Sequence, residues 1–279
     1  MTPGRFVAAA AIAALVPGAA AAQELAYVGG VQLATGSYVF QTRTTGVALS
    51  SGLDATLGPL RLTAAIPLIA QNTPWISYAG GTMVPSGGPE HGTASRQGMG
   101  RHRMDSGDVV LPDTVAYSTI GFGDPTMGLT LDIVRGFGRP TLRLTAGAKA
   151  PIARPDQGFG TGQWDYGAGL SLAAAAGLTM FFADAQYWIL GDLPDLVLEN
   201  TILLSAAVGR PLGSTSRLAG MLSLSGSTPA IQGLAAPIQL GAGVSTGLGR
   251  GRAVALSAAV GLTDSAPDLS LASSWRVAF

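Results

Sequence analysis

Charged side chains recur along this chain at positions that alternate with apolar ones. Asp132 stands between leucine and isoleucine, and Arg143 stands between two leucines. Carboxylates and guanidinium groups spaced in this way can line a polar passage and select solutes by charge. They can equally form ion pairs between neighbouring strands and fill a narrow interior. The candidate lining residues with this pattern are Asp54, Arg61, Asp124, Asp132, Arg143, Lys149, Asp165, Asp184, Glu199, Arg217 and Arg276.

The two histidines, His91 and His102, are the other candidates for chemistry. A hydrolytic triad needs a base held against its nucleophile by a rigid frame, whereas both histidines lie in a stretch rich in Gly and Ser. Together with Asp105 and Asp108 they lack the fixed ligand spacing of a zinc site. The Gly-Phe-Gly at 121–123 is not followed by the helical pattern that a nucleotide-binding loop requires. We therefore expect no enzyme, no metal site and no cofactor.

Apolar and polar residues alternate with a period of two, which indicates that strands position the charged residues. In the segment Asp268–Phe279, one parity holds Leu269, Leu271, Trp275, Val277 and Phe279, and the other holds Arg276. Side chains alternate across a strand, so this segment predicts a strand with one apolar face. The same alternation recurs in about twelve segments, each of about ten residues or more, as in membrane barrels. No charged residue falls on the apolar parity within the cores of these segments.

Composition supports this interpretation. Only 11% of the 279 residues are charged, whereas soluble domains contain about 25%. The mean hydropathy is +0.37, yet no stretch beyond the N-terminus is apolar for the roughly 18 residues that a spanning helix needs. Sixteen basic and sixteen acidic residues leave no basic field to bind nucleic acid. The absence of cysteine excludes disulfides and thiolate metal sites.

The lengths of the connections alternate. Short connections are expected at 58–59, 136–140, 175–177, 211–216 and 249–252, and most of the longer ones at 72–118, 151–163, 191–196 and 227–237, although that at 263–266 is short. Outer-membrane barrels have short periplasmic turns and longer extracellular loops. We therefore predict an all-β fold: a closed antiparallel transmembrane β-barrel of about 12 strands with one long extracellular loop, 72–118. Pro67 and Pro125 fall inside expected strands, and we expect bulges there because proline lacks a ladder donor.

The long loop 72–118 leaves three interpretations open. It can fold inward as a plug or constriction, or it can be mobile, as its Gly and Ser content permits. It can also cover the outer mouth, with Arg96, Arg101 and Arg103 facing lipopolysaccharide phosphates. We favour a partly ordered cover.

Aromatic residues sort by depth along the expected strands. Trp164, Tyr166, Tyr187 and Trp188 fall near the outer rim, and Trp275, Phe279, Phe181 and Tyr27 fall near the inner rim. Aromatic girdles at both interfaces are typical of lipid-embedded barrels.

The two termini predict export. Residues 1–22 combine Arg5, an apolar stretch and a small-residue site before Gln23, which predicts a secretory signal cleaved after Ala22. The barrel then spans 23–279 and is expected in the bacterial outer membrane, in contact with lipid and lipopolysaccharide. A final strand ending on Phe279 resembles the closing strand of outer-membrane barrels, which implies recognition by the barrel assembly machinery.

Three motifs carry a family resemblance. They are Gly121-Phe-Gly-Asp-Pro-Thr-Met-Gly-Leu-Thr-Leu-Asp-Ile133, then Ala146-Gly-Ala-Lys-Ala-Pro151, then Gly160-Thr-Gly-Gln-Trp-Asp-Tyr-Gly-Ala-Gly-Leu170. Over about residues 118–175 the chain resembles an outer-membrane barrel family named after phenol meta-pathway degradation, whose members are often labelled as transporters. The chain departs from the family where Ile-Ala-Arg-Pro follows Pro151. The resemblance implies a barrel that passes small hydrophobic, often aromatic, compounds.

Two functions are therefore weighed. The first is a passive outer-membrane channel, or transporter, for small hydrophobic or aromatic solutes. The small Gly, Ala, Ser and Thr residues on the inward parity favour it, because a barrel of about twelve strands then keeps a narrow cavity. The alternative is a structural or surface-binding barrel whose filled interior passes nothing.

Overall fold

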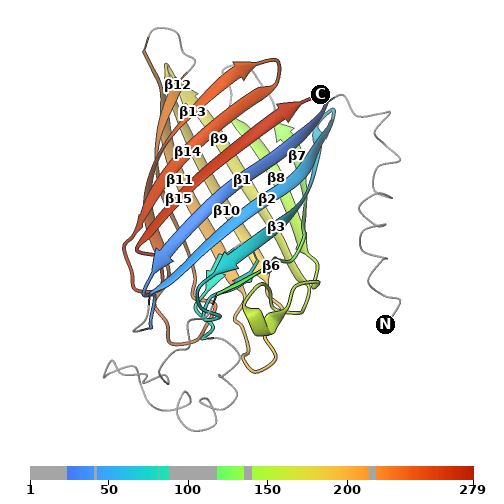
Figure 1. The fold of residues 1–279 in the computed structure, drawn as a ribbon. Coiled ribbons are helices and arrows are strands. Elements are labelled where there is room, and N and C mark those ends of the chain that lie inside the picture. The colour runs from blue at the N-terminus through green and yellow to red at the C-terminus, as the bar shows by residue number, and fades with distance from the viewer. Residues whose placement is uncertain (1–23, 41–42, 81, 88–117, 135–139, 214–217) are drawn as a thin grey trace.

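Twelve long strands close into a barrel in the computed structural model of this chain (Figure 1). The structure describes residues 24–40, 43–80, 82–87, 118–134, 140–213 and 218–279. The expected signal segment 1–22 and residues 88–117 of the long loop, including both histidines, lie outside the described residues. The sequence prediction of an all-β closed barrel is confirmed.

Eleven of the ring positions are single strands, and the twelfth is shared by β6 (Thr119–Phe122) and β7 (Thr126–Val134). The others are β1 (Glu24–Gly36), β2 (Thr44–Leu57), β3 (Leu60–Gln71), β8 (Thr141–Lys149), β9 (Asp165–Ala176), β10 (Thr179–Ile189), β11 (Thr201–Leu212), β12 (Leu218–Ser227), β13 (Ile238–Gly249), β14 (Arg252–Gly261) and β15 (Leu269–Ala278).

The barrel closes where the last strand pairs with the first. β15 lies antiparallel to β1 in a continuous register from Ala26 opposite Ala278 to Thr35 opposite Leu269. On its other side β1 pairs with β2, so the sheet has no free edge between the chain ends. A closed ring satisfies the backbone hydrogen bonds internally, as a lipid environment requires.

The wall is interrupted at Pro125, where the sequence predicted a bulge. β3 pairs with β7 up to Ala65 opposite Thr126, and resumes with β6 at Leu68 opposite Phe122. The register shifts by one residue between these two pairs, and the intervening Gly123, Asp124 and Pro125 lie outside the strands, although the Gly123 amide still donates to Pro67 O. The bulge expected at Pro125 is thus confirmed, while β3 runs through Pro67 without a break in its pairing with β2.

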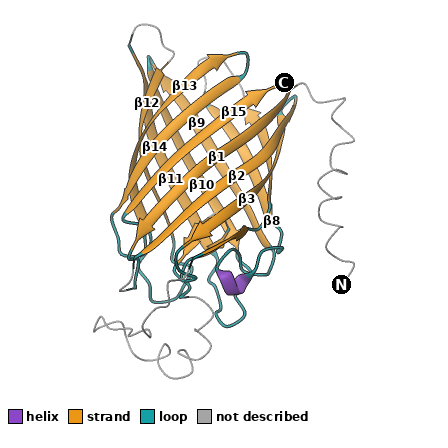
Figure 2. Ribbon diagram, viewed as in Figure 1, coloured by secondary structure: helices purple, strands orange, loops and turns teal. Residues whose placement is uncertain are grey.

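The two ends of the barrel differ, as Figure 2 shows by colour. At one end, here called the turn end, β2 is joined to β3 through Gly58, and β9 to β10 through Gly177, both with φ near +60°. Glycine adopts this left-handed conformation without strain. The opposite end, here called the loop end, carries the longer connections, including the short 3₁₀ helix η3 (Pro155–Gln157). The expected alternation of connection lengths is confirmed for the described turns.

The outer face of the wall is apolar. Large side chains on the apolar parity are between 40% and 59% exposed at mid-strand positions on seven strands, and they point away from the interior: Leu49, Leu129, Leu170, Leu204, Leu222, Leu240 and Leu256. Trp275 lies on the same face, over Gly29 of β1. An apolar outer band of this kind is what a barrel presents to lipid.

A hairpin follows β3 at the loop end. It consists of β4 (Ser77–Ala79) and β5 (Thr82–Val84), and both strands are largely buried. Ala79 and Val84 pack against Leu190 and Leu198 from the connection between β10 and β11. The described start of the long loop is therefore ordered and packs against another connection at this end; these packed connections are called the cover.

Candidate functional site

The most deeply buried charges of the described chain form one cluster at the loop end. Lys149 Nζ lies 2.6 Å from Asp124 Oδ2, 3.2 Å from Asp165 Oδ2 and 3.1 Å from Thr161 Oγ1. Each of these four residues is at most 3% exposed. Because these contacts hold several loops together, we call Asp124, Lys149, Thr161 and Asp165 the clasp.

Strand register places the clasp. Lys149 ends β8 and Asp165 begins β9, directly opposite each other in the ladder. Asp124 lies in the interruption between β6 and β7, one strand further round the wall. Thr161 enters from the loop between β8 and β9. The sequence predicted these three charged residues as separate members of the inward parity, and the fold brings them together.

Backbone amides complete the clasp and tie three connections to it. Asp124 Oδ1 accepts hydrogen bonds from the amides of Ile152 and Ala153, at 2.9 and 2.7 Å. The two oxygens of Asp165 accept from Gly80 in the hairpin at 2.7 Å and from Gly191 before β11 at 2.8 Å. Two carboxylates and one ammonium give the clasp a formal charge of −1. Buried carboxylates need such donors, because a buried charge without partners is costly.

An aromatic ring lies in the interior beside the clasp. Trp188 of β10 lies on the polar parity, and its ring lies over the backbones of Gly147 and Gly167. Its Nε1 donates to Gln186 Oε1 at 3.2 Å. The expectation that Trp188 belongs to an aromatic girdle facing lipid is therefore wrong. Trp188 and Asp184 are separated by an even number of residues and so face the same side of β10, which was the sequence signal for an inward ring. Trp164 and Tyr166 do lie on the exposed face, stacked with centroids 5.9 Å apart.

Two tyrosines lie among the loops, Tyr38 buried and Tyr78 half-buried. Burial raises the pKa of Tyr78 to about 12. Burial, with added repulsion from Tyr78 and Asp268, also raises the pKa of Tyr38. Tyr38 donates its hydroxyl to Met83 Sδ at 3.8 Å, which joins the first loop to the hairpin.

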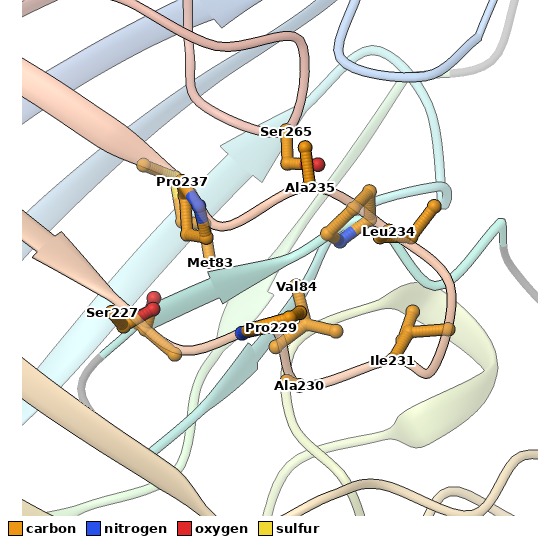
Figure 3. A pocket seen from close by; sticks show the side chains of 12 residues that line it. Met83, Val84, Ser227, Pro229, Ala230, Ile231, Leu234, Ala235, Pro237 and Ser265 are labelled. Atoms are coloured by element: carbon orange, nitrogen blue, oxygen red, sulfur yellow. The ribbon is translucent and has the colours of Figure 1, made fainter.

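A small apolar recess opens between the hairpin and the β12–β13 connection (Figure 3). Met83 and Val84 face Pro229, Ile231 and Leu234 across it. Its volume of about 10 Å³ admits no more than about one water molecule. In the described conformation this recess is a narrow gap between packed loops and is too small to hold a solute.

A second group of charges lies toward the turn end. Arg276 of β15 donates to Glu24 of β1 and, at 3.0 Å, to Asp54 of β2. Arg61 of β3 lies 3.6 Å from the same Asp54, which is buried. These ion pairs bridge four adjacent strands across the seam where the barrel closes.

Three more of the expected lining residues are Asp132 and Arg143, near the turn end, and Asp184, at the middle of β10. Asp132 and Arg143 face each other in the β7–β8 ladder with 2.8 Å between Oδ1 and Nε. Asp184 accepts hydrogen bonds from Ser171 and from Ser205, its ladder partners on both sides.

The remaining expected lining residues lie elsewhere. Glu199 is an exposed residue of the connection before β11, outside the strand wall. Arg217 lies outside the described residues. Among the described residues, no group of three or more His, Cys, Asp or Glu side chains is arranged to hold a metal ion. No helix in the described ranges is long and apolar enough to cross a membrane.

Comparison with known proteins identifies the fold. No protein-family model and no curated protein sequence matches the chain. An outer membrane channel from Pseudomonas putida F1 superimposes with a TM-score of 0.64 at 12% identity, over 92% of this chain and 95% of that chain. The monoaromatic hydrocarbon channel CymD gives 0.46 at 8% identity, over 92% and 89%. The toluene transporter TodX of P. putida gives 0.42 at 9% identity, over 94% and 89%. The first of these likenesses establishes a shared barrel fold.

Proposed function

We propose that this protein is a passive outer-membrane channel for small hydrophobic, often aromatic, solutes. The observation that carries the proposal is a difference between the side chains at the two ends of the interior. Ion pairs line the turn end, whereas at the loop end the side chains of Ile69, Phe159 and Trp188 add apolar surface to the interior beside the charged clasp. Apolar surface beside a clasp whose charges are already paired favours entry of apolar molecules over that of ions and sugars.

The closed wall and its apolar outer band support placement in the outer membrane. In this proposal the signal 1–22 directs export and is cleaved after Ala22. The strand that ends at Phe279 engages the assembly machinery, and the loop end faces the lipopolysaccharide. The outer membrane channel that shares this barrel fold agrees with the channel function we propose. The proposal includes no catalytic step.

The direct test is solute flux through a purified, folded sample. Vesicles with lipopolysaccharide in the outer leaflet are suitable, because a plain phospholipid bilayer already passes toluene. Labelled toluene should enter vesicles that contain the protein several times faster than empty ones. Equal rates with folded protein present would count against a channel.

A filled structural barrel is the second candidate, and the clasp favours it. Ion pairs and loops that already fill the loop end leave little room for passage. This alternative predicts no toluene flux and no conductance in planar bilayers, for the wild type and for variants that disrupt the clasp. The channel predicts that such variants conduct more than the wild type.

A further inference from the structure

The ring of Phe159 occupies a slot in the inner face of the wall. Phe159 lies in the β8–β9 connection and is 1% exposed. Its ring lies so close to the backbone of Gly121 that an added Cβ there would be 2.6 Å from Cε2 and 3.0 Å from Cδ2. Any other residue at 121 would push the ring out, so the glycine provides the space for an aromatic ring.

Apolar side chains form the wall of this slot. Ile69 pairs with Gly121 in the β3–β6 ladder, so the two residues face the same side of the sheet. Ile69 is buried, and its Cδ1 together with Pro67 Cγ crowds the space above Gly123, at 2.6 and 2.9 Å from where a Cβ would lie. Ile69 and Pro67 therefore give the slot an apolar wall.

One buried acceptor lies beside the slot. Gln71 follows Ile69 by two residues on the same face of β3, about 7 Å away along the strand. Its Nε2 donates to Gln157 O at 2.7 Å and to Ile76 O at 3.4 Å, which fixes the orientation of the amide. Its Oε1 accepts no hydrogen bond from the described residues, although the side chain is buried. A buried acceptor without a donor is costly, and a bound donor would satisfy it.

Glycines flank the ring in sequence. Gly158, with φ of +74°, and Gly160 stand on either side of Phe159. Glycine imposes few backbone limits, so the ring can leave the slot by local rotation. The contacts of the clasp to Ala153 and Thr161 remain on both sides of that short segment.

We propose that this slot binds a single aromatic ring of a solute, and that Phe159 is an internal occupant that the solute displaces. Gln71 Oε1 gives the site a preference for a ring that carries one hydrogen-bond donor, such as a hydroxyl or amino group. This inference rests on the proposed channel function and locates one binding site along its path.

The test removes the internal occupant. Phe159→Ala, in the full barrel purified in detergent, leaves an apolar cavity of a kind that binds benzene. Benzene at about 100 times its Kd should raise the unfolding midpoint of this variant by about 5–10 °C. Phenol should bind several-fold more tightly than benzene, and a second change, Gln71→Leu, should abolish that difference. The wild type should show no shift, because Phe159 fills the slot.

Phe40→Ala is the matched control. Phe40 packs against Trp75 at the same end of the barrel, with ring centroids 5.2 Å apart, outside the slot. This variant also loses a phenylalanine side chain, but outside the slot. Benzene should therefore raise its unfolding midpoint no more than it raises that of the wild type. Equal shifts in both variants would mean unspecific partition and would overturn the proposal. If Phe159→Ala does not fold, Phe159→Leu is tested in its place. A smaller rise of its unfolding midpoint with benzene would support the slot, and the absence of any rise would refute it.

These results are separable from the test of the channel. Toluene flux through the wild type, without benzene binding by Phe159→Ala, overturns the slot and leaves the channel function standing. Binding by the variant, with no flux through any form of the protein, supports the slot and overturns the channel.

Discussion

Lys149, the last residue of β8, faces Asp165, the first residue of β9, and its ammonium lies 3.2 Å from that carboxylate. The pair lies where the wall ends and the loops begin, with Asp124 on the other side of the ammonium at 2.6 Å. The loops that cover the barrel are thus attached to the wall through buried charges.

Lys149→Met should weaken this attachment severely. It leaves two buried carboxylates with no cation between them, which typically costs about 3–5 kcal/mol of the free energy of unfolding. Denaturant unfolding should report this loss, and single-channel recording should show higher conductance through loosened loops. Arg43→Gln is the control, because Arg43 pairs with Asp268 where both side chains are about half exposed. Its cost should not exceed about 1 kcal/mol. Similar losses in both variants would refute the special role of the clasp.

Gly167→Ala should displace the ring of Trp188. The ring lies on the backbone of Gly167, so an added methyl group has no room. Overpacking of this kind costs about 1–3 kcal/mol. Tryptophan fluorescence should change together with the unfolding midpoint. Gly247→Ala in β13 is the control, because nothing lies within 4 Å of the added Cβ. If the two variants behave alike, Trp188 does not lie inside the barrel.

Alkaline pH should destabilise the cover through Tyr78. Its pKa is raised from 10.0 to about 12 by burial, so the folded state holds the phenol neutral while the unfolded state ionises from about pH 10. The stabilising contribution is complete below about pH 10 and is lost as pH rises toward 12. Hydrogen exchange of the hairpin, followed from pH 8 to pH 11, should accelerate beyond its ordinary base dependence in the wild type. In Tyr78→Phe this additional acceleration should disappear; if it persists unchanged, another group titrates.

The outward face allows a prediction that depends on depth. Val244 lies in the middle of β13 on the apolar parity, and Leu248 lies on the same parity near the turn end. Arginine at the lipid midplane costs about 2–4 kcal/mol, and near the interface about 0–1 kcal/mol. Val244→Arg should therefore destabilise the barrel in lipid far more than Leu248→Arg, as measured by unfolding in vesicles. Equal costs would contradict the orientation of β13.

The sequence was sufficient to predict the barrel because its physical signal is local. The two-residue period of β13 and the break at Pro125 each depend on a few neighbouring residues, as do tight turns such as that at Gly58. An even number of strands places both chain ends at the same end of the barrel, where β15 closes on β1.

The arrangement at the loop end could not be predicted in the same way. The clasp joins residues from separate connections and uses the backbone amides of Gly80 and Gly191, which no side-chain pattern reveals. Phe159 lies in a loop without periodicity, and only the fold places Gly121 beneath its ring. Glu199 was assigned inward by extending the parity of β11 beyond the point at which the strand begins.

The most direct test of the account measures the entry of a small aromatic molecule into living cells. Gram-negative cells that produce the full chain in the outer membrane, checked for folding by heat-modifiable gel migration, should take up labelled toluene several times faster than cells without it. Uptake of a labelled sugar of similar size should be unchanged, because the charges of the clasp are already paired and the side chains beside them are apolar. Equal toluene uptake with and without the folded barrel would contradict the proposed function.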